Sequence, residues 1–158
     1  MRAFEGSPYL SLSQDGSEII CHRHDTPRPW CNYLTNGDFT AIVTQTGAGF
    51  SFLYDSMYNQ VLHSGDLTLN EPIPGRYLYL RDSDSGEYWN PTVTPSMRPP
   101  DAFEARHAPG STTLRTSQQG IETTMTVFVP LDRNEEKWVI KLRNTSKQRR
   151  WLCLYSFC

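Results

Sequence analysis

The sequence predicts an all-β fold, specifically an antiparallel β-sandwich. Short runs rich in Val, Ile, Thr, Tyr, Phe and Trp follow one another along the chain, and Gly, Pro, Asn and Asp separate them. No segment shows the period of about 3.6 residues that an amphipathic helix requires. The close spacing of the runs favours a sandwich over alternating strands and helices, because a connecting helix needs about ten residues or more.

Nine segments are expected to be strands. Residue pairs that typically reverse the chain precede two of them: Asp15-Gly16 comes before the expected strand 17–21, and Pro74-Gly75 comes before the expected strand 76–81. In chain order, the expected strands are 17–21, 39–44, 49–55, 76–81, 102–107, 112–116, 121–129, 137–142 and 150–157.

Three of these strand pairs have the turn chemistry of hairpins. Glycine-rich segment 44–49 and segment 118–120 supply residues that adopt positive φ without steric conflict, and Asn144 begins a polar turn within 143–149. Segments 62–74 and 88–101 are proline-containing and are expected to be long ordered loops, where binding groups commonly lie.

Length and charge exclude several classes of protein. The chain has 158 residues and a net charge of −2, which suits one domain and disfavours electrostatic binding of nucleic acid. No apolar run approaches the roughly 18 residues of a membrane helix, and segment 1–8 lacks the features of a secretory signal. We therefore expect a cytoplasmic protein with neither nucleic acid nor membrane as a partner.

The four cysteines are expected to be free thiols. Cys21 and Cys31 lie near His22 and His24, but their spacing matches none of the paired ligand patterns of zinc sites. Buried thiols and surface imidazoles explain this cluster better, and no metal is expected.

Two charged segments could carry chemistry, but each has a simpler explanation. Segment 82–87 gathers three carboxylates, yet its glycine comes one position too early for a calcium loop, so a solvated hairpin turn is favoured. Glu104 and Arg106 lie two residues apart on an expected strand and therefore share a face. An ion pair is the simpler interpretation there, and a functional carboxylate–guanidinium site is the alternative.

Aromatic side chains in the expected loops are candidates for stacking on sugar rings. Most of the aromatic residues alternate along strands, so about half of them should face the core. Trp30, Tyr88 and Trp89 lie in loops instead, and these three are the predicted substrate-binding residues.

A set of motifs in register resembles a known family. In order and spacing it is similar to the amino-terminal domain of glycoside hydrolase family 94, the cellobiose and related disaccharide phosphorylases formerly grouped as a glycosyltransferase family. The motifs lie at 26–34 (TPRPWCNYL), 47–52 (GAGFSF), 74–82 (PGRYLYLRD), 85–89 (SGEYW), 103–107 (FEARH), 126–130 (TVFVP), 143–146 (RNTS) and 154–157 (LYSF).

The resemblance implies a galactose-mutarotase-like β-supersandwich that is followed in the family by a helical linker and an (α/α)6 barrel. It also implies reversible, inverting phosphorolysis of a β-linked disaccharide with inorganic phosphate as co-substrate and no cofactor. An already anionic phosphate needs no general base, so one catalytic acid suffices. The family carries that acid in the barrel, so the resemblance transfers no catalytic residue to this sequence.

The whole of 1–158 is therefore expected to be an amino-terminal β-sandwich domain, incomplete at its carboxyl end and lacking the barrel. Its implied role is a carbohydrate-associated scaffold that forms homodimers in the full-length enzyme. We also expect that the chain does not fold stably alone, because its last apolar run would be an exposed edge. A free-standing carbohydrate-binding sandwich that uses Trp30, Tyr88 and Trp89 is the alternative function.

Overall fold

The computed structural model describes residues 4–63 and 75–157, and this part of the chain consists of strands and their connections. The strands are β1 (Leu10–Leu12), β2 (Ile19–Cys21), β3 (Cys31–Thr35), β4 (Phe39–Thr44), β5 (Ser51–Leu53), β6 (Gln60–Leu62), β7 (Tyr77–Asp82), β8 (Tyr88–Trp89), β9 (Ala102–Ala108), β10 (Ser111–Gln118), β11 (Ile121–Phe128), β12 (Lys137–Asn144) and β13 (Leu152–Phe157).

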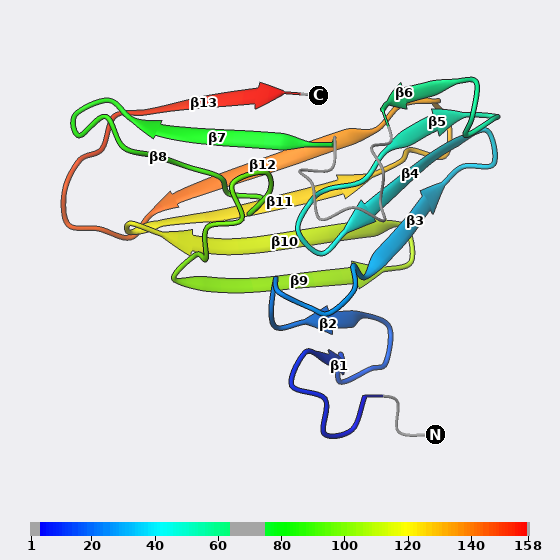
Figure 1. The fold of residues 1–158 in the computed structure, drawn as a ribbon, viewed down its shortest axis with the longest axis horizontal. Coiled ribbons are helices and arrows are strands. Elements are labelled where there is room, and N and C mark those ends of the chain that lie inside the picture. Colours follow the sequence, from blue (N-terminus) through cyan, green and yellow to red (C-terminus); the bar gives the residue numbers. More distant parts are fainter. Residues whose placement is uncertain (1–3, 64–74, 158) are drawn as a thin grey trace.

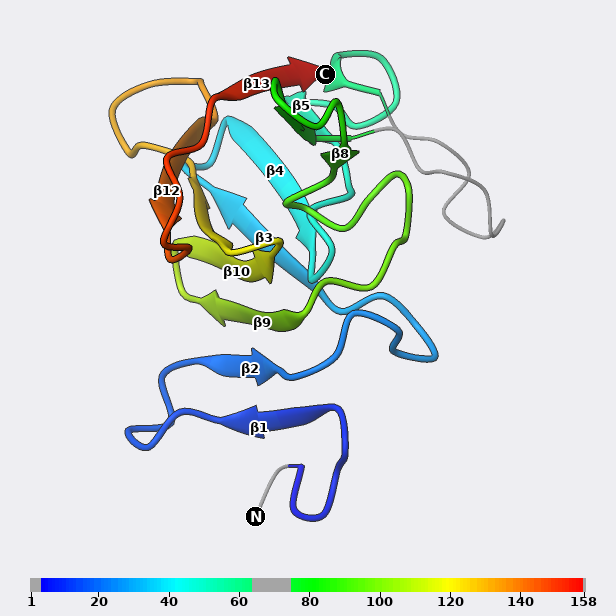
Figure 2. The ribbon, with the colours of Figure 1, turned by 90° about the vertical axis from the view of Figure 1, so that its left-hand side faces the viewer.

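These strands form three antiparallel sheets. The largest has the order β1-β2-β9-β10-β11-β12, the second β3-β4-β5-β6 and the third β13-β7-β8. Figure 1 shows the largest sheet from β1 at the bottom to β12, with β7 and β13 of the third sheet above it and the β3–β6 sheet at the right. In Figure 2 the strands from β9 to β12 curve around β3 and β4, so the largest sheet covers one face of the second sheet.

The main hydrophobic core lies between the sheets. It is formed by every second residue of the strands, because these residues point to the same side of a sheet. Along β11, Ile121, Thr123, Met125 and Val127 are buried while the residues between them are more exposed. Successive side chains of a strand point to opposite faces, so this alternation gives the sheet one apolar face. The core contains Leu34, Phe39, Ala41, Val43, Leu78, Met125, Val127 and Val129.

The predicted all-β antiparallel fold is confirmed, and each of the nine expected strands is present with shifts of a few residues at its ends. The sequence did not predict β1, β3, β6 and β8. Three of these strands have only two or three residues, too few to show a period. In β3 the apolar residues are interrupted by polar ones, because most of the strand is exposed.

Two of the predicted hairpins are confirmed and one is wrong. Segments 44–49 and 118–120 join β4 to β5 and β10 to β11. Segment 143–149 instead carries the chain from the edge of the largest sheet to the third sheet, because β12 pairs with β11 and β13 pairs with β7. The Arg150–Asp82 ion pair and the bond from Ser83 N–H to the Trp151 carbonyl, 2.8 Å, hold the arriving chain beside β7.

The two predicted loops have different outcomes. Most of the 62–74 loop lies outside the described residues. The 88–101 segment begins with β8, and the connection to β9 starts only after Trp89. Within the described ranges there is no helix of the length and hydropathy that crossing a membrane requires.

Candidate functional site

The acidic segment 82–87 forms the turn between β7 and β8. The residue Asp82 is 2% exposed, and its carboxylate accepts hydrogen bonds from the backbone N–H groups of Asp84, 2.8 Å, and Ser85, 3.0 Å. The Ser85 N–H, followed by the Arg150 guanidinium and the Asp84 N–H, lowers the pKa of Asp82 against the opposing effect of burial. The predicted hairpin turn is confirmed, and its first carboxylate is a structural group that anchors the turn.

A cavity of about 290 Å³ opens beside this turn, and we call it the Tyr88 cleft. Tyr88 is 52% exposed, and the guanidinium carbon of Arg98 lies 5.6 Å from the centroid of its ring. Gln119, at the tip of the β10–β11 hairpin, donates from Nε2 to the Glu87 carboxylate at 2.7 Å. The cleft is lined by Ser85, Gly86, Glu87, Tyr88, Arg98, Gln118 and Gln119.

The Tyr88 cleft combines one aromatic ring with donors and acceptors that suit sugar hydroxyls. Carboxylate oxygens accept, a guanidinium donates, and side-chain amides do both. The guanidinium of Arg98 lies over the Tyr88 ring, and the 52% exposure of Tyr88 leaves ring surface against which a sugar can stack. The cleft can therefore position a polyhydroxylated ligand, but it has no residue arranged as a nucleophile with an adjacent base.

Tyr88 and Trp89 both lie in β8, so their predicted place in a loop is wrong, and Trp89 is only 2% exposed. Its side chain belongs to a separate hydrophobic cluster with Leu80 and Ile121, against which Leu152 packs. Tyr88 and Trp89 are successive residues of one strand and must face opposite sides of the sheet. In this structure Tyr88 is the accessible ring and Trp89 is a core residue.

Trp30 is half-buried and packs against a third hydrophobic cluster, which contains Leu10 and Cys21. Its ring meets that of Phe4 edge to face, with 5.5 Å between their centroids. Its backbone N–H donates to the side-chain oxygen of Gln45 at 2.9 Å. The structure thus places the three predicted aromatic residues in three different environments, and of the three only Tyr88 lines the cleft.

Arg98, Gln118 and Gln119 are cleft residues that the sequence analysis did not single out. Gln118-Gln119-Gly120 was predicted as a turn, and Arg98 lay within a predicted loop. Their convergence depends on β8 lying beside the tip of the β10–β11 hairpin, which no local sequence signal reveals. The signal for this site that the sequence did contain was Tyr88 directly after the 82–87 turn.

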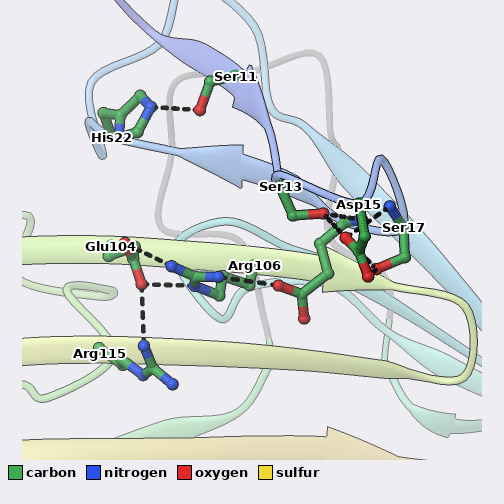
Figure 3. A network of polar contacts seen from close by, with 9 residues as sticks. Ser11, Ser13, Asp15, Ser17, His22, Glu104, Arg106 and Arg115 are labelled. Carbon is green, nitrogen blue, oxygen red and sulfur yellow. Dashed lines mark hydrogen bonds and ion pairs between the residues drawn. The ribbon is translucent and has the colours of Figure 1, made fainter.

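The Glu104–Arg106 pair is an ion pair within a larger network, as Figure 3 shows. Arg106 Nε lies 2.7 Å from Glu104 Oε1, and its Nη1 lies 2.9 Å from Glu18 Oε2 on the other side. Arg115 Nη1 joins the same Glu104 oxygen at 3.2 Å. The hydrogen bond from Arg106 is the main cause of the lowered pKa of Glu104. The simpler interpretation of this pair is confirmed: it links β9 to its neighbours.

The cysteines and histidines of segment 21–31 do not gather around a metal position. The structure shows Cys21, Cys31 and Cys153 as free thiols, and burial raises the pKa of Cys21 to about 11. His22 instead bonds to Ser11 Oγ at 2.8 Å (Figure 3). Over residues 4–63 and 75–157, no three Cys, His, Asp or Glu side chains are placed to share an ion.

His107 is the buried histidine of the β9–β10 pair. It is 7% exposed, and its Nδ1 forms a hydrogen bond with Thr112 Oγ1 at 3.0 Å. Burial disfavours the charged imidazolium and lowers the pKa of His107 from 6.5 to about 4. The folded protein therefore holds this side chain neutral across the pH range in which an exposed histidine titrates.

We expect His107 to make the protein less stable as the pH falls from 6.5 towards 4. In that range the unfolded chain binds a proton at this residue and the folded chain does not, so acid favours unfolding. The free energy of unfolding should drop by about 2 kcal/mol between pH 7.5 and 5.0. Urea unfolding at both pH values should show this drop, and His107→Gln should remove most of it. His22→Gln is the control and should keep it, and an equal drop in all three proteins would contradict the assignment.

Comparison with known proteins gives one family and several relatives. The family model "Glycosyl hydrolase 94, supersandwich domain" matches residues 17–158. The chain is 30% identical over 151 residues to the N,N'-diacetylchitobiose phosphorylase of Vibrio furnissii and 33% identical over 152 residues to that of Vibrio proteolyticus. It is 33% identical over 148 residues to the 3-O-beta-D-glucopyranosyl-beta-D-glucuronide phosphorylase of Paenibacillus borealis.

The matches cover nearly all of this chain but a small part of each relative. They span 94% of the chain in all three cases, and 19%, 19% and 18% of the respective relatives. The chain thus spans about a fifth of the length of the curated relatives it matches.

Proposed function

The chain belongs to the glycosyl hydrolase 94 family, as its supersandwich domain, and from this premise we propose that it is a non-catalytic scaffold and dimerisation domain. The enzyme it serves would be an inverting phosphorylase of a β-linked disaccharide. The observation that carries the proposal is the match over residues 17–158, together with relatives that are themselves named phosphorylases. Because the chain corresponds to about 19% of such a relative, we assign the catalytic acid to the remainder of the enzyme.

The carboxylates inside this domain support a non-catalytic role. A general acid needs a raised pKa and an open path to the leaving oxygen. The side chains of Asp82 and Glu136 are only 3% and 6% exposed, but each is held by an arginine, Arg150 and Arg76 respectively. The pKa of Asp82 is lowered rather than raised. Both carboxyl groups are therefore structural partners of arginines.

The outer face of β13 supports the dimerisation role. Tyr155 and Phe157 are 52% and 65% exposed and share one side of the strand, and Trp151, just before the strand, is 57% exposed. Large exposed aromatic groups are enriched at protein interfaces, and contiguous apolar surface is uncommon on monomers. A second copy of the same enzyme is the partner we propose for this domain.

The chemistry of the proposed reaction needs no cofactor, since inorganic phosphate is the attacking co-substrate. The free thiols Cys21, Cys31 and Cys153 support a reducing, cytoplasmic location.

The full-length protein provides the test. We expect it to cleave one β-linked disaccharide from a panel that includes cellobiose and N,N'-diacetylchitobiose, only when phosphate is present, and to release an α-sugar 1-phosphate. Light scattering should give the mass of two chains. Turnover by residues 1–158 alone would contradict the non-catalytic assignment, and a monodisperse full-length monomer would contradict the dimerisation role.

A carbohydrate-binding module is the second candidate, and the Tyr88 cleft is the observation that favours it. One cavity of about 290 Å³ is lined by the Tyr88 ring, the Arg98 guanidinium, the Glu87 carboxylate and the amides of Gln118 and Gln119. That volume lies near the lower end of the usual range of ligand pockets.

On this second candidate, Tyr88→Ala should weaken the binding of cello-oligosaccharides roughly tenfold. Loss of one aromatic stacking partner removes about 0.5–1.5 kcal/mol of binding free energy, in addition to the contribution of the surface that the ring buries. Calorimetric titration of the full-length protein would measure the change. Tyr33→Ala, at a tyrosine that is 67% exposed on β3, is the control and should bind as the unmodified protein does. Equal affinity of both variants would reject the cleft as a sugar site.

A further inference from the structure

Asn36 lies in the turn between β3 and β4, and it is the only asparagine of the sequence that is followed by glycine. In an Asn-Gly pair the backbone nitrogen attacks the preceding side-chain amide most readily, because glycine has no side chain to shield that nitrogen or to restrict its φ and ψ. Gly37 is exposed and has a φ of 104°. The turn therefore contains the pair of residues that is most prone to spontaneous deamidation.

The Asn36 side chain joins this turn to the connection between β11 and β12. Its Nδ2 donates to the carbonyls of Pro130, 3.2 Å, and Arg133, 2.8 Å. The same nitrogen donates to Asn134 Oδ1 at 3.1 Å. Figure 1 shows the β3–β4 turn and the β11–β12 connection at the same end of the molecule. These three hydrogen bonds, which we call the Asn36 latch, tie the β3–β6 sheet to the largest sheet.

The folded turn holds both of the groups that would react. Asn36 Oδ1 accepts hydrogen bonds from the backbone N–H groups of Asp38, 3.1 Å, and Phe39, 2.8 Å, so the amide is fixed through its oxygen as well as its nitrogen. The attacking nitrogen of Gly37 donates its hydrogen to Thr35 Oγ1 at 3.0 Å. Ring closure requires the Asn36 side chain to turn towards that nitrogen, and this movement breaks the Asn36 latch.

We propose that Asn36 is a deamidation site, protected while the turn is folded and modified when the Asn36 latch opens. The Gly37 nitrogen loses its proton to solvent and forms a bond to Asn36 Cγ. The bond from Cγ to Nδ2 breaks, and Nδ2 takes up a proton and leaves as ammonia. Water then opens the succinimide ring, either at Cγ to give aspartate or at the backbone carbonyl carbon of residue 36 to give isoaspartate.

The product cannot form the Asn36 latch again. A carboxylate only accepts hydrogen bonds, so it would place a negatively charged oxygen against the carbonyls of Pro130 and Arg133. Isoaspartate also lengthens the backbone of the turn by one carbon atom. Opening of the turn is thus recorded as a permanent chemical change, and the modified protein keeps a weakened junction between the two sheets.

Peptide mapping of the full-length protein by mass spectrometry, after incubation at mildly alkaline pH with and without urea, tests the protection. In urea, Asn36 should deamidate faster than Asn32 and Asn59, and Gly37→Ala should slow its reaction. In the folded protein the rate at Asn36 should be about tenfold or more lower, because an opening free energy of only about 1.4 kcal/mol gives tenfold protection. Equal rates at Asn36 in the folded and unfolded protein, or a faster reaction at Asn32 or Asn59 in urea, would overturn the proposal.

Asn36→Asp tests the consequence, because it reproduces the aspartate product and keeps an oxygen that can accept from the turn. We expect its urea unfolding midpoint to be lower than that of the unmodified protein. Asn59→Asp is the matched control, since it adds the same charge at an exposed asparagine, and it should keep the midpoint. Equal midpoints for the two variants would contradict the loss of the Asn36 latch. The rates at Asn36 are measured on the unmodified sequence and therefore test the protection even if Asn36→Asp does not fold.

Discussion

Arg76→Met is expected to lower the free energy of unfolding by about 3–5 kcal/mol. Arg76 is 0% exposed, donates from Nε and Nη2 to the two carboxylate oxygens of Glu136, and donates from Nη1 to the Ile42 carbonyl at 3.0 Å. Methionine fills a similar volume but leaves a buried carboxylate without a cation and a buried carbonyl without a donor. Unpaired buried charge is among the most destabilising changes a core can receive.

Urea unfolding of three variants would check this expectation. The double variant Arg76→Met/Glu136→Met should regain most of the lost stability, because apolar pairs replace buried ion pairs with little net change. Arg23→Met is the matched control, since the Arg23–Asp25 pair is about half exposed on both sides and should contribute less than about 1 kcal/mol. The expectation fails if the single variant loses no more than this control, or if the double variant is less stable than the single one.

Gly49→Ala is expected to lower the free energy of unfolding by about 4 kcal/mol or more. Gly49 has a φ of 125°, and a Cβ atom at this position would lie 2.1 Å from the Ile42 carbonyl oxygen and 2.9 Å from its carbon. That carbonyl belongs to β4, where the Ile42 N–H also donates to the Phe50 carbonyl at 2.8 Å. The backbone would have to separate β4 from β5 to admit a single methyl group.

Gly37→Ala isolates the part of this effect that comes from the positive φ alone. Gly37 has a similar φ of 104°, but a Cβ there would meet nothing within 4 Å. Its substitution should therefore show only the cost of a positive φ, about 1–2 kcal/mol. Thermal or urea unfolding of the two alanine variants would give the comparison directly, and equal losses would show that the contact with Ile42 is relieved without strain.

The two expected effects share one atom and should not add. The Ile42 carbonyl oxygen is both the acceptor for Arg76 and the atom that an alanine at 49 would meet. Variants that act on a common group are energetically coupled, whereas distant ones add. The double variant Arg76→Met/Gly49→Ala should lose clearly less stability than the two single losses combined.

The sequence was sufficient to predict those strands in which buried and exposed residues alternate over a long stretch. Residues 121–128 alternate at every position, and 39–44 combine a preceding turn signal with β-branched residues. Strands of two or three residues such as β8 carry no such pattern, because pairing with a longer neighbour decides whether they form. Strand pairing also escaped prediction for 150–157, since the strand with which it pairs, Tyr77–Asp82, is far away in the sequence.

The candidate site could be predicted only in part, because it too depends on contacts between residues that are distant in the sequence. Alternation in a strand implies that Tyr88 and Trp89 face opposite sides, but only the packing of Leu80 and Ile121 decides which ring is buried. Arg76 and Glu136 are sixty residues apart, so the sequence around either residue does not predict that the two form an ion pair. The Tyr88 cleft arises between elements that are distant along the chain, where local patterns carry no information.

The pairing of β7 with β13 has a consequence for biosynthesis. β7 is completed at Asp82, but the strand that covers its other edge ends at Phe157. At about 5–20 residues per second, a ribosome needs several seconds to make the intervening chain. During that interval the backbone groups along this edge of Tyr77–Asp82 await their partner, and the nascent chain presents an open edge that chaperones or neighbouring nascent chains can engage. Rapid translation of the segment between the two strands would shorten this exposure.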